Sequence, residues 1–438
     1  MTTPPRTLCS QLPAAAPGTA VTLEGWVHRR RELARITFVV VRDRSGLAQV
    51  VLPAGTAVPP EETTVRVTGT ATANEQAPGG TEVTDAALEP LTEPAETSPA
   101  ELWRPSLDVS LPTLLDHAPV LWRHPAQRAR WQLAAASLRG FRSTLDGLGF
   151  TEVTTPKVVG TATESGANVF PVDWFGRPAY LAQSPQFYKQ QLVGVFERVY
   201  EVGPVFRAEP HDTVRHLAEY RSLDVELGFI RDHREVLAVL RDVLAGMVGA
   251  AASEEAAVEG TGASLPVVPD EIPVIHFADA LTLVGAPADE PDLAPEHERA
   301  LGAWALAEHG SDFLAVEGYP MTKRPFYTHP WSRDGAGAPP RPTEPPVEGS
   351  NSFDLLFRGL ELVTGGQRLH RASDYERAIR ARGEDPGAYA AYLQAFRHGM
   401  PPHGGFAIGL ERWVARLVRA ANIREVTLFP RDLNRLVP

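Results

Sequence analysis

The chain of 438 residues has little of what would mark several protein classes. It holds one cysteine, Cys9, which excludes a disulfide framework and a thiolate metal cluster. No stretch approaches the length of an apolar membrane span, and the opening MTTPPRTLCS lacks the apolar run of a signal peptide. We therefore expect a cytoplasmic protein without a membrane partner.

Lysine is also scarce, since only Lys157, Lys189 and Lys323 stand among the 42 basic residues. The sequence contains no GxxxxGK[ST] phosphate loop and no GxSxG elbow. Three scattered lysines do not form a KMSKS-like loop either. Several common nucleotide-binding and hydrolase devices are therefore excluded, and each lysine marks a position where arginine was not used.

The composition is that of a globular protein, with 43% hydrophobic and 22% charged residues. The length predicts two or three domains. A net charge of −12 argues against a general nucleic-acid coat, but residues 29–44 hold six arginines against Glu32 and Asp43. This local excess of positive charge leaves room for a nucleic-acid contact near the N-terminus.

Residues 20–91 predict five short strands, separated mostly by Gly, Pro and Asn clusters: 21–29, 34–43, 46–52, 63–71 and 82–91. Five strands in this length fit a Greek-key barrel of the OB type, although other small barrels fit nearly as well. The proline-rich stretch that follows has little periodicity and predicts an interdomain linker. We expect an α+β protein with a barrel at 1–98, a linker or hinge at 99–126 and a larger domain at 127–438.

The segment 206–229 predicts two strands joined by a polar loop. Four apolar residues alternate along the second strand and are expected to face the core: Leu223, Val225, Leu227 and Phe229. The opposite face then carries Ser222, Asp224 and Glu226. Four ionisable residues lie near the ends of the loop: Arg207, Glu209, Arg215 and His216. This pattern favours a binding site, and a solvated hairpin with surface ion pairs is the alternative.

The segment 352–370 predicts a hairpin with a two-residue turn at 358–359. This register pairs Asp354 with Val363 and makes Glu361 a diagonal neighbour on the same face as Asp354. Such neighbours lie roughly 7–8 Å apart, close enough for two carboxylates to share a cation. Oxygen ligands suit Mg²⁺ rather than zinc. Two acids on a wet sheet face are the alternative.

The segment 404–420 predicts a buried helix that begins just after Gly409, because five apolar residues keep helical spacing: Leu410, Trp413, Val414, Leu417 and Val418. Arg412 falls in its first turn, where the helix dipole disfavours a cation. A bound anion would make this position of the arginine favourable. The alternative is a surface arginine whose unfavourable interaction with the helix dipole is not compensated.

Taken in order, these segments resemble motifs 1, 2 and 3 of the class II aminoacyl-tRNA synthetases. Motif 1 corresponds to a long helix followed by GFTEVTTP (149–156), motif 2 to 206–229, and motif 3 to GFAIGLER (405–412). The resemblance implies an OB-fold anticodon-binding domain and a catalytic domain with an antiparallel sheet flanked by helices. It also implies a homodimer, because motif 1 builds the dimer interface in this class.

Within the class, LAQSPQFYKQ (181–190) resembles the amino-acid pocket of aspartyl-tRNA synthetases, and the short spacing between motif 2 and FDLLF resembles their compact archaeal-type branch. Asparaginyl enzymes lack a lysine at the position of Lys189, and a β-carboxylate needs a cation where an amide does not. Arg368 matches an arginine that grips the same carboxylate. The resemblance implies an L-aspartate pocket with these members: Glu164, Gln183, Gln186, Lys189, Asp224, Thr364 and Arg368.

The resemblance also implies an ATP site made by six residues: Arg207, Glu209, Arg215, His216, Glu361 and Arg412. Arg207 would hold the α-phosphate and Arg412 the γ-phosphate, as the two catalytic arginines. Asp354, Glu361 and Thr364 match Mg²⁺ ligands, but in an ideal hairpin Thr364 faces away, so a β-bulge near 365–366 is required. The aspartate α-carboxylate would attack the α-phosphorus of ATP, and the tRNA ribose would then take the aspartyl group without any protein nucleophile.

The barrel is expected to read the tRNA anticodon. Phe38 matches a residue that stacks a base and Gln49 one that hydrogen-bonds it, while Glu82 would accept from a cytosine amino group at the third position. A place in the barrel core is the alternative for Phe38, since its neighbours are apolar.

The stretch His28-Arg29-Arg30 and Pro78 resemble relaxed members of the branch that charge both tRNA(Asp) and tRNA(Asn). We expect this non-discriminating form, whose Asp-tRNA(Asn) would feed an amidotransferase. Other interpretations stay open: a strictly discriminating enzyme, an asparaginyl-tRNA synthetase, a non-catalytic synthetase paralogue, or a plain OB single-strand binder. The last leaves the downstream domain unexplained. The ATP-site arginines and metal-site acids are all present, which argues against a loss of catalysis: Arg207, Asp354, Glu361 and Arg412.

Overall fold

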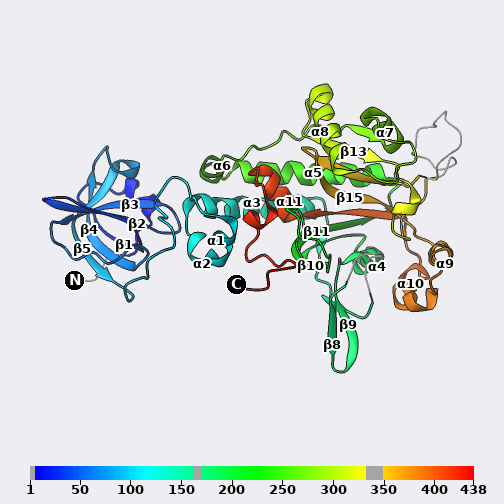
Figure 1. Cartoon of the computed structure of the whole chain (residues 1–438), viewed down its shortest axis with the longest axis horizontal. Helices are drawn as coiled ribbons and strands as arrows, with labels where there is room; N and C mark the ends of the chain where they lie inside the picture. The colour runs from blue at the N-terminus through cyan, green and yellow to red at the C-terminus, as the bar shows by residue number, and fades with distance from the viewer. Residues whose placement is uncertain (1–4, 162–168, 332–348) are drawn as a thin grey trace. The chain divides into compact units, whose positions relative to one another are not determined.

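The computed structural model describes residues 5–161, 169–331 and 349–438 (Figure 1). The chain forms two compact units, residues 1–128 and residues 129–438. The boundary between them falls just beyond the predicted linker.

The first unit is built on a closed five-stranded barrel. Its strands are β1 (Ala20–Glu32), β2 (Ile36–Arg42), β3 (Leu47–Pro53), β4 (Thr64–Ala73) and β5 (Thr81–Pro90). They close in the order β1-β2-β3-β5-β4, with β3 and β5 parallel. Alternate apolar side chains fill the interior, as period-2 patterning requires: Leu23, Val39, Val41, Val50, Val67 and Val83. This strand order is that of an OB fold, so the predicted barrel is confirmed.

The predicted linker contains two short helices, α1 (Leu111–Asp116) and α2 (Ala118–Leu121). These helices were not predicted from the sequence. Each helix carries a proline in its first turn, where the missing N–H costs no hydrogen bond. The proline content that suggested a linker is thus compatible with helix starts.

The second unit is organised by one eight-stranded sheet with the order β12-β13-β14-β15-β16-β11-β10-β6. Its strands are β6 (Thr151–Glu152), β10 (Arg198–Phe206), β11 (Glu219–Gly228), β12 (Val274–His276), β13 (Phe313–Glu317), β14 (Ser352–Phe357), β15 (Glu361–Arg368) and β16 (His403–Gly409). All neighbours are antiparallel except the parallel end pairs β12–β13 and β10–β6. The antiparallel centre agrees with the predicted α+β class.

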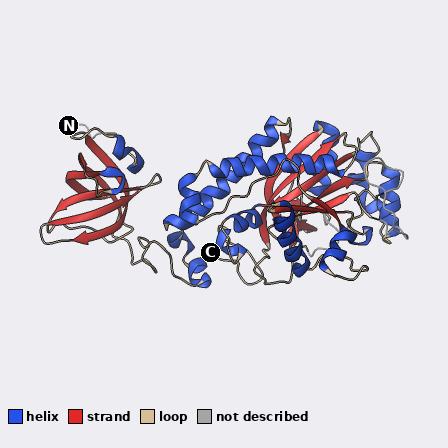
Figure 2. Ribbon diagram, turned by 90° about the horizontal axis from the view of Figure 1, so that it is seen from above, coloured by secondary structure: helices blue, strands red, loops and turns tan. Residues whose placement is uncertain are grey.

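Three helices pack on one face of this sheet and bury the main core: α3 (Pro125–Gly147), α5 (His233–Ala252) and α11 (Leu410–Leu417). Figure 2 shows helices flanking the sheet of the larger unit. α3 and α5 approach so closely that a Cβ on Gly140 would lie 2.3 Å from the carbonyl oxygen of Gly246. Glycine at this crossing therefore allows the two helix backbones to touch.

The remaining helices surround the other parts of the sheet: α4 (Gln186–Phe196), α6 (Glu255–Thr261), α7 (Phe277–Val284), α8 (Pro295–His309), α9 (Ala372–Ala381) and α10 (Ala390–Phe396). Within the described residues no single helix has the length and apolar composition of a membrane span. α5 and α6 together have this length and composition, but they form a pair bent by 87°.

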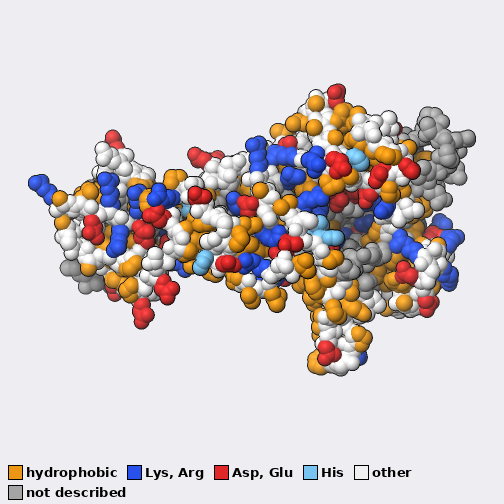
Figure 3. All heavy atoms as spheres, in the orientation of Figure 1, with side chains coloured by type: hydrophobic (Ala, Val, Ile, Leu, Met, Phe, Trp, Pro, Cys, Tyr) orange, Lys and Arg blue, Asp and Glu red, His pale blue; other side chains and the backbone are white. Residues whose placement is uncertain are grey.

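A small separate sheet joins β7 (Val158–Val159), β9 (Arg177–Leu181) and β8 (Pro171–Trp174). The β8–β9 hairpin projects from the unit, and hydrophobic side chains cover much of its visible surface (Figure 3). Phe175 in its turn is 86% exposed.

The predicted alternation along β11 is confirmed for Leu223, Val225 and Leu227, which lie in the core. It was wrong for Phe229: β11 ends at Gly228, and Phe229 adopts a φ of +61° and is 70% exposed. The positive φ breaks the alternation and turns its side chain out to solvent.

Candidate active site

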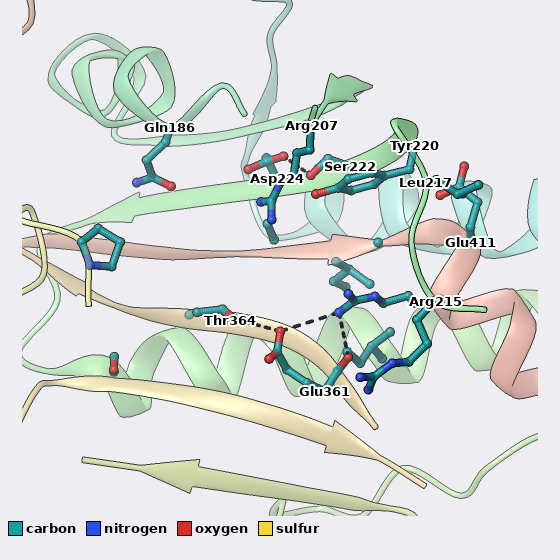
Figure 4. Close-up of a pocket in the computed structure, with 18 of the residues that line it drawn as sticks. Gln186, Arg207, Arg215, Leu217, Tyr220, Ser222, Asp224, Glu361, Thr364 and Glu411 are labelled. Carbon is teal, nitrogen blue, oxygen red and sulfur yellow. Dashed lines mark hydrogen bonds and ion pairs between the residues drawn. The ribbon is translucent and has the colours of Figure 1, made fainter. Parts of the chain in front are cut away.

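A cavity of about 320 Å³ opens on the side of the sheet opposite the main core. It brings together eleven of the predicted site residues: Gln186, Lys189, Arg207, Glu209, Arg215, His216, Asp224, Glu361, Thr364, Arg368 and Arg412. They come from α4, the 207–218 loop, β11, β15 and the first turn of α11. In Figure 4, Arg207 and Asp224 extend from one side of the cavity, and Glu361 and Thr364 face them from the other.

Three predicted residues lie elsewhere. Gln183 is fully buried and Asp354 is 4% exposed, and neither lines the cavity. Glu164 lies outside the described residues.

One end of the cavity is closed by a buried cluster of two cations and two anions. The Nζ of Lys189 lies 3.0 Å from Oδ1 of Asp224 and 3.3 Å from Oε2 of Glu226. The Nε of Arg368 donates to Oε1 of Glu226 at 3.1 Å, and its Nη2 donates to the carbonyl oxygen of Gly405 at 2.9 Å. All four side chains are 8% exposed or less.

The positive charges of this cluster stabilise the ionised form of Glu226. Burial acts to raise the pKa of Glu226, but the positive charges of Arg368 and Lys189 outweigh it and hold that pKa below its usual range. Asp224 also accepts a hydrogen bond of 2.5 Å from the hydroxyl of Ser222. A buried lysine and arginine that point into a cavity suit a carboxylate ligand.

The hairpin that carries the predicted metal ligands has the expected turn but a shifted register. Arg358 and Gly359 both have positive φ, as a two-residue type I′ turn requires. A β-bulge then inserts Leu362, so Asp354 pairs with Thr364 instead of the predicted Val363. The bulge therefore lies a few residues before the predicted position near 365–366. It still has the predicted effect on Thr364, which shares a face of the hairpin with Asp354.

Glu361 lies in an acidic corner of the cavity. Removal from bulk water and the neighbouring charge of Asp354 raise the pKa of Glu361 to about 7. The hydroxyl of Thr364 lies 3.5 Å from its Oε1. Oxygen donors whose mutual repulsion raises a pKa fit a hard divalent cation such as Mg²⁺. Glu361 and Thr364 thus offer oxygen atoms that suit the predicted metal, but Arg324 binds both carboxylate oxygens of Asp354. Among the described residues, no group of three or more His, Cys, Asp or Glu side chains is arranged to hold a metal ion.

Arginines from two elements line the other end of the cavity. Arg412 in the first turn of α11 donates from Nη1 to the carbonyl oxygen of Glu361 at 3.2 Å. Arg215 lies 3.8 Å from Oε2 of Glu298 and Arg207 lies 3.9 Å from Oε1 of Glu209. These three arginines bring three guanidinium groups to one part of the cavity, which suits the binding of a polyanion.

His216 lies beside these arginines in the 207–218 loop. Its Nδ1 is 2.6 Å from the hydroxyl of Thr213, and its Nε2 is 3.4 Å from Oε2 of Glu209. Burial lowers the pKa of His216, so its ring is neutral at physiological pH.

The barrel presents a second group of predicted residues on its outer face. Cross-strand pairing places Arg29 beside Val40, Val40 beside Gln49, and Gln49 beside Glu82. The Nε2 of Gln49 donates to Oε2 of Glu82 at 2.8 Å. Phe38 is half-buried on the same face, whereas the adjacent Thr37 and Val39 are buried. The alternative of a barrel-core position for Phe38 is therefore excluded.

His28 and Pro78 are placed differently. A bulge between Val27 and Arg29 turns His28 inward, where it is 5% exposed and its Nδ1 lies 3.0 Å from Nη1 of Arg42. Burial, followed by the charge of Arg42, lowers the pKa of His28 to about 4. Pro78 is exposed at the start of the Pro78–Gly80 turn before β5. Of the residues that were predicted to set the range of tRNAs charged, only Arg29 lies on the same outer face of the barrel as Phe38.

Residues 111–433 match the family described as tRNA synthetases class II (D, K and N), and residues 21–91 match the OB-fold nucleic acid binding domain. The chain belongs to the class II tRNA synthetases of this family. The predicted family and fold are thus confirmed.

This synthetase is 44% identical to the aspartate–tRNA(Asp/Asn) ligase of Deinococcus radiodurans, over an alignment of 447 positions that covers all of both chains. It is 45% identical to the enzyme of the same name from Thermus thermophilus, with 96% of this chain and 97% of the relative covered. A relative from Pyrobaculum aerophilum, 35% identical over 96% of both chains, is named aspartate–tRNA(Asp) ligase.

Solved structures of two specificities resemble the synthetase. The asparaginyl-tRNA synthetase from Pyrococcus horikoshii with asparaginyl-adenylate gives a TM-score of 0.88 at 28% identity over 99% of each chain. A putative aspartyl-tRNA synthetase from Leishmania major gives 0.86 at 27% identity, with 100% of this chain and 96% of that chain covered. Because the two structures are named for different amino acids, the fold does not distinguish an aspartyl from an asparaginyl enzyme. The residues of the pocket must make this distinction.

Four charged residues at or beside the synthetase site were not predicted as site members: Glu226 and Glu411, which belong to the motif segments, and Arg324 and Glu298. Arg324 lines the cavity and binds both carboxylate oxygens of Asp354, at 3.2 and 2.9 Å. Glu298 on α8 is 8% exposed and accepts from the backbone N–H of Glu361 at 3.1 Å. Neither belongs to a motif segment, although Arg324 follows Lys323, a lysine that the scarcity of that residue had marked.

Proposed function

We propose that this synthetase is an aspartate–tRNA ligase, which activates L-aspartate with ATP and transfers the aspartyl group to the 3′ end of tRNA. The observation that carries this proposal is the buried pair of cations, Lys189 and Arg368, at the closed end of the cavity. A β-carboxylate that binds there would form its own ion pairs with the two cations, in place of the ion pairs that these now form with Glu226 and Asp224. The neutral amide of asparagine has no charge to offer in that exchange.

The substrate ammonium group fits the acidic side of the same cluster. Asp224 lines the cavity with Gln186 nearby on α4, so we assign these residues to the α-amino group. This orientation directs the α-carboxylate along the cavity toward Arg207. The carboxylate then attacks the α-phosphorus of ATP and pyrophosphate leaves, and binding of both reactants in one site supplies most of the acceleration.

We assign Arg207 to the α-phosphate and Arg412 to the γ-phosphate, with Glu209, Arg215 and His216 around the adenine and the other phosphates. A phosphate would give Arg412, in the first turn of α11, a second anionic partner besides Glu361, whose Oε1 lies 3.7 Å from its Nη1. Glu361 and Thr364, with Asp354, would hold Mg²⁺. A divalent cation bound there neutralises phosphate charge in the transition state.

The barrel is proposed to bind the anticodon through Phe38, Gln49 and Glu82. The hydrogen bond between Gln49 and Glu82 makes the two side chains a single unit that accepts and donates at one base edge. We assign residues 1–98 to this anticodon-binding domain, 99–126 to a hinge and 127–438 to catalysis.

We further propose that the enzyme charges both tRNA(Asp) and tRNA(Asn), as the names of its relatives from Deinococcus and Thermus state for those proteins. Asp-tRNA(Asn) would then be a substrate for an amidotransferase. We also propose a cytoplasmic homodimer, for which sedimentation would give twice the chain mass of 47.5 kDa.

The test has two stages. Amino-acid-dependent exchange of pyrophosphate into ATP, with L-aspartate and L-asparagine compared, decides the amino acid. Charging of unmodified tRNA(Asp) and tRNA(Asn) transcripts with ATP and Mg²⁺ decides the tRNA scope. Exchange with asparagine alone would refute the proposal, and charging of tRNA(Asn) at under one-hundredth of the efficiency for tRNA(Asp) would refute the relaxed scope.

A further inference from the structure

The 207–218 loop, which carries Arg215 and His216 into the cavity, is held from its outer side by the C-terminal segment, residues 422–435. In Figure 1 this segment, drawn in red, runs past α11 to the β10–β11 strand pair. The isolated bridge between Glu219 and Arg431 places it directly beside the start of β11. No part of the function proposed above uses these contacts.

Arg424 is the centre of the contact. It is 7% exposed, and its guanidinium binds two carboxylates at once: Nη2 donates to Oδ1 of Asp212 and Nε donates to Oδ2 of Asp432, each at 2.5 Å. Its Nη1 donates to the carbonyl oxygen of Thr213 at 3.1 Å. Charge-assisted hydrogen bonds of this kind are among the stronger ones in proteins.

Three further hydrogen bonds fix the same stretch of loop. Asn434 donates from Nδ2 to Oδ2 of Asp212 at 2.7 Å, so both oxygens of this carboxylate are held. The backbone N–H of Ile423 donates to the carbonyl oxygen of Val214 at 3.0 Å. The N–H of Ala218 donates to the carbonyl oxygen of Arg431 at 2.7 Å.

The C-terminal segment has hydrogen bonds of its own where it meets the loop. Asp432 accepts from the backbone N–H groups of Asn434 and Arg435, both at 2.8 Å, which closes a turn and presents Asn434 to Asp212. Three consecutive loop residues, 212 to 214, therefore contact one preformed partner, and Arg215 and His216 follow them directly.

We propose that the C-terminal segment positions the 207–218 loop for ATP, with Arg424 and Asp212 as positioning residues. This inference rests on the proposed function in one respect, the assignment of Arg215 and His216 to ATP. Neither positioning residue lines the cavity, so their effect on ATP passes through the loop backbone. Loss of the contact increases the number of loop conformations, of which only a fraction binds ATP.

The test compares Asp212→Ala with a matched control, Asp270→Ala. The side chain of Asp212 is 47% exposed, so its removal leaves the core intact. Asp270 is a fully exposed aspartate that pairs with Arg241 at 3.0 Å and does not line the cavity. Both variants thus lose one Asp–Arg ion pair, but only the first loses a link to the loop.

Two readouts are measured on the full chain. In Asp212→Ala we expect the ATP KM in pyrophosphate exchange to rise about 3- to 10-fold with a smaller change in kcat. We also expect amide hydrogen exchange of residues 208–216 to become about tenfold faster. Asp270→Ala should match the wild type in both. Asn434→Ala, which removes a single hydrogen bond, should shift both readouts in the same direction by less.

An unchanged ATP KM or unchanged amide exchange in Asp212→Ala would overturn the inference, as would an equal change in Asp270→Ala. Hydrogen exchange needs no substrate, so it tests the anchoring even if the wild type fails to activate aspartate. That failure would refute the proposed function alone, and faster loop exchange in Asp212→Ala would then still support the anchoring.

Discussion

The cavity and the outer barrel face, the two proposed binding sites, are built by different physical means. In the cavity, Lys189, Asp224 and Arg368 come from three separate elements and form ion pairs almost out of contact with water. On the barrel, Phe38, Gln49 and Glu82 stand on neighbouring strands and stay partly exposed. We therefore expect the loss of one buried charge to have a large effect at the first site, and the loss of one contact to have a moderate effect at the second.

The largest effect is expected for Lys189→Gln. The substitution leaves Asp224 and Glu226 short of a buried cation, and we expect kcat/KM for aspartate-dependent pyrophosphate exchange to fall about 100-fold or more. Gln49→Ala in the barrel should leave this exchange unchanged. Thermal unfolding of both variants checks that the fold is intact. A Lys189→Gln enzyme that still activates aspartate at the wild-type rate would remove the contrast between the two sites.

The next effect is expected for Phe38→Ala. Loss of a stacking platform should lower kcat/KM for tRNA charging about 10- to 100-fold while pyrophosphate exchange, which needs no tRNA, stays constant. Val51→Ala, the cross-strand neighbour of Phe38, controls for a general loss of apolar surface. Equal losses of kcat/KM in the two variants would mean that the barrel face binds tRNA through its total apolar contact area and not through stacking on Phe38.

A smaller effect is expected for Glu298→Gln. The amide keeps an acceptor for the N–H of Glu361 but loses the charge that faces Arg215. We expect the ATP KM to change about 3- to 10-fold, with kcat for pyrophosphate exchange much less affected. Glu308→Gln, an exposed change on the same helix, is the control. A fall in kcat alone would indicate that Glu298 acts on the transition state and not on nucleotide binding.

The smallest effect concerns His28. Its pKa of about 4 in the folded protein lies below its usual value of about 6.5, so the unfolded chain binds the proton more readily. Its contribution to stability is therefore present above pH 6.5 and is lost as the pH falls through 4. The stability difference between wild type and His28→Gln, from urea unfolding, should shrink from pH 7 to pH 4.5. A difference that grows on acidification would contradict the buried, neutral assignment.

The sequence predicted some parts of the fold and the sites better than others, and the difference has a physical reason. Strand alternation placed Asp224 and Glu226 correctly because period 2 holds along a regular strand. The two bulges, at Leu362 and at His28, each reversed a side chain, and a bulge leaves no reliable mark in composition. Arg324 and Glu298 escaped notice because tertiary folding, and not a local motif, brings them to the site.

The neutral cluster at the end of the cavity also has a consequence for ligands that resemble the substrate. Because its two cations already satisfy two anions, the pocket is not a general trap for negative charge. A dicarboxylate without an amino group, such as succinate, displaces Asp224 from Lys189 but supplies no ammonium group to receive it. We therefore expect the enzyme to discriminate against simple dicarboxylates, since only a ligand that carries both signs of charge would leave every buried ion paired.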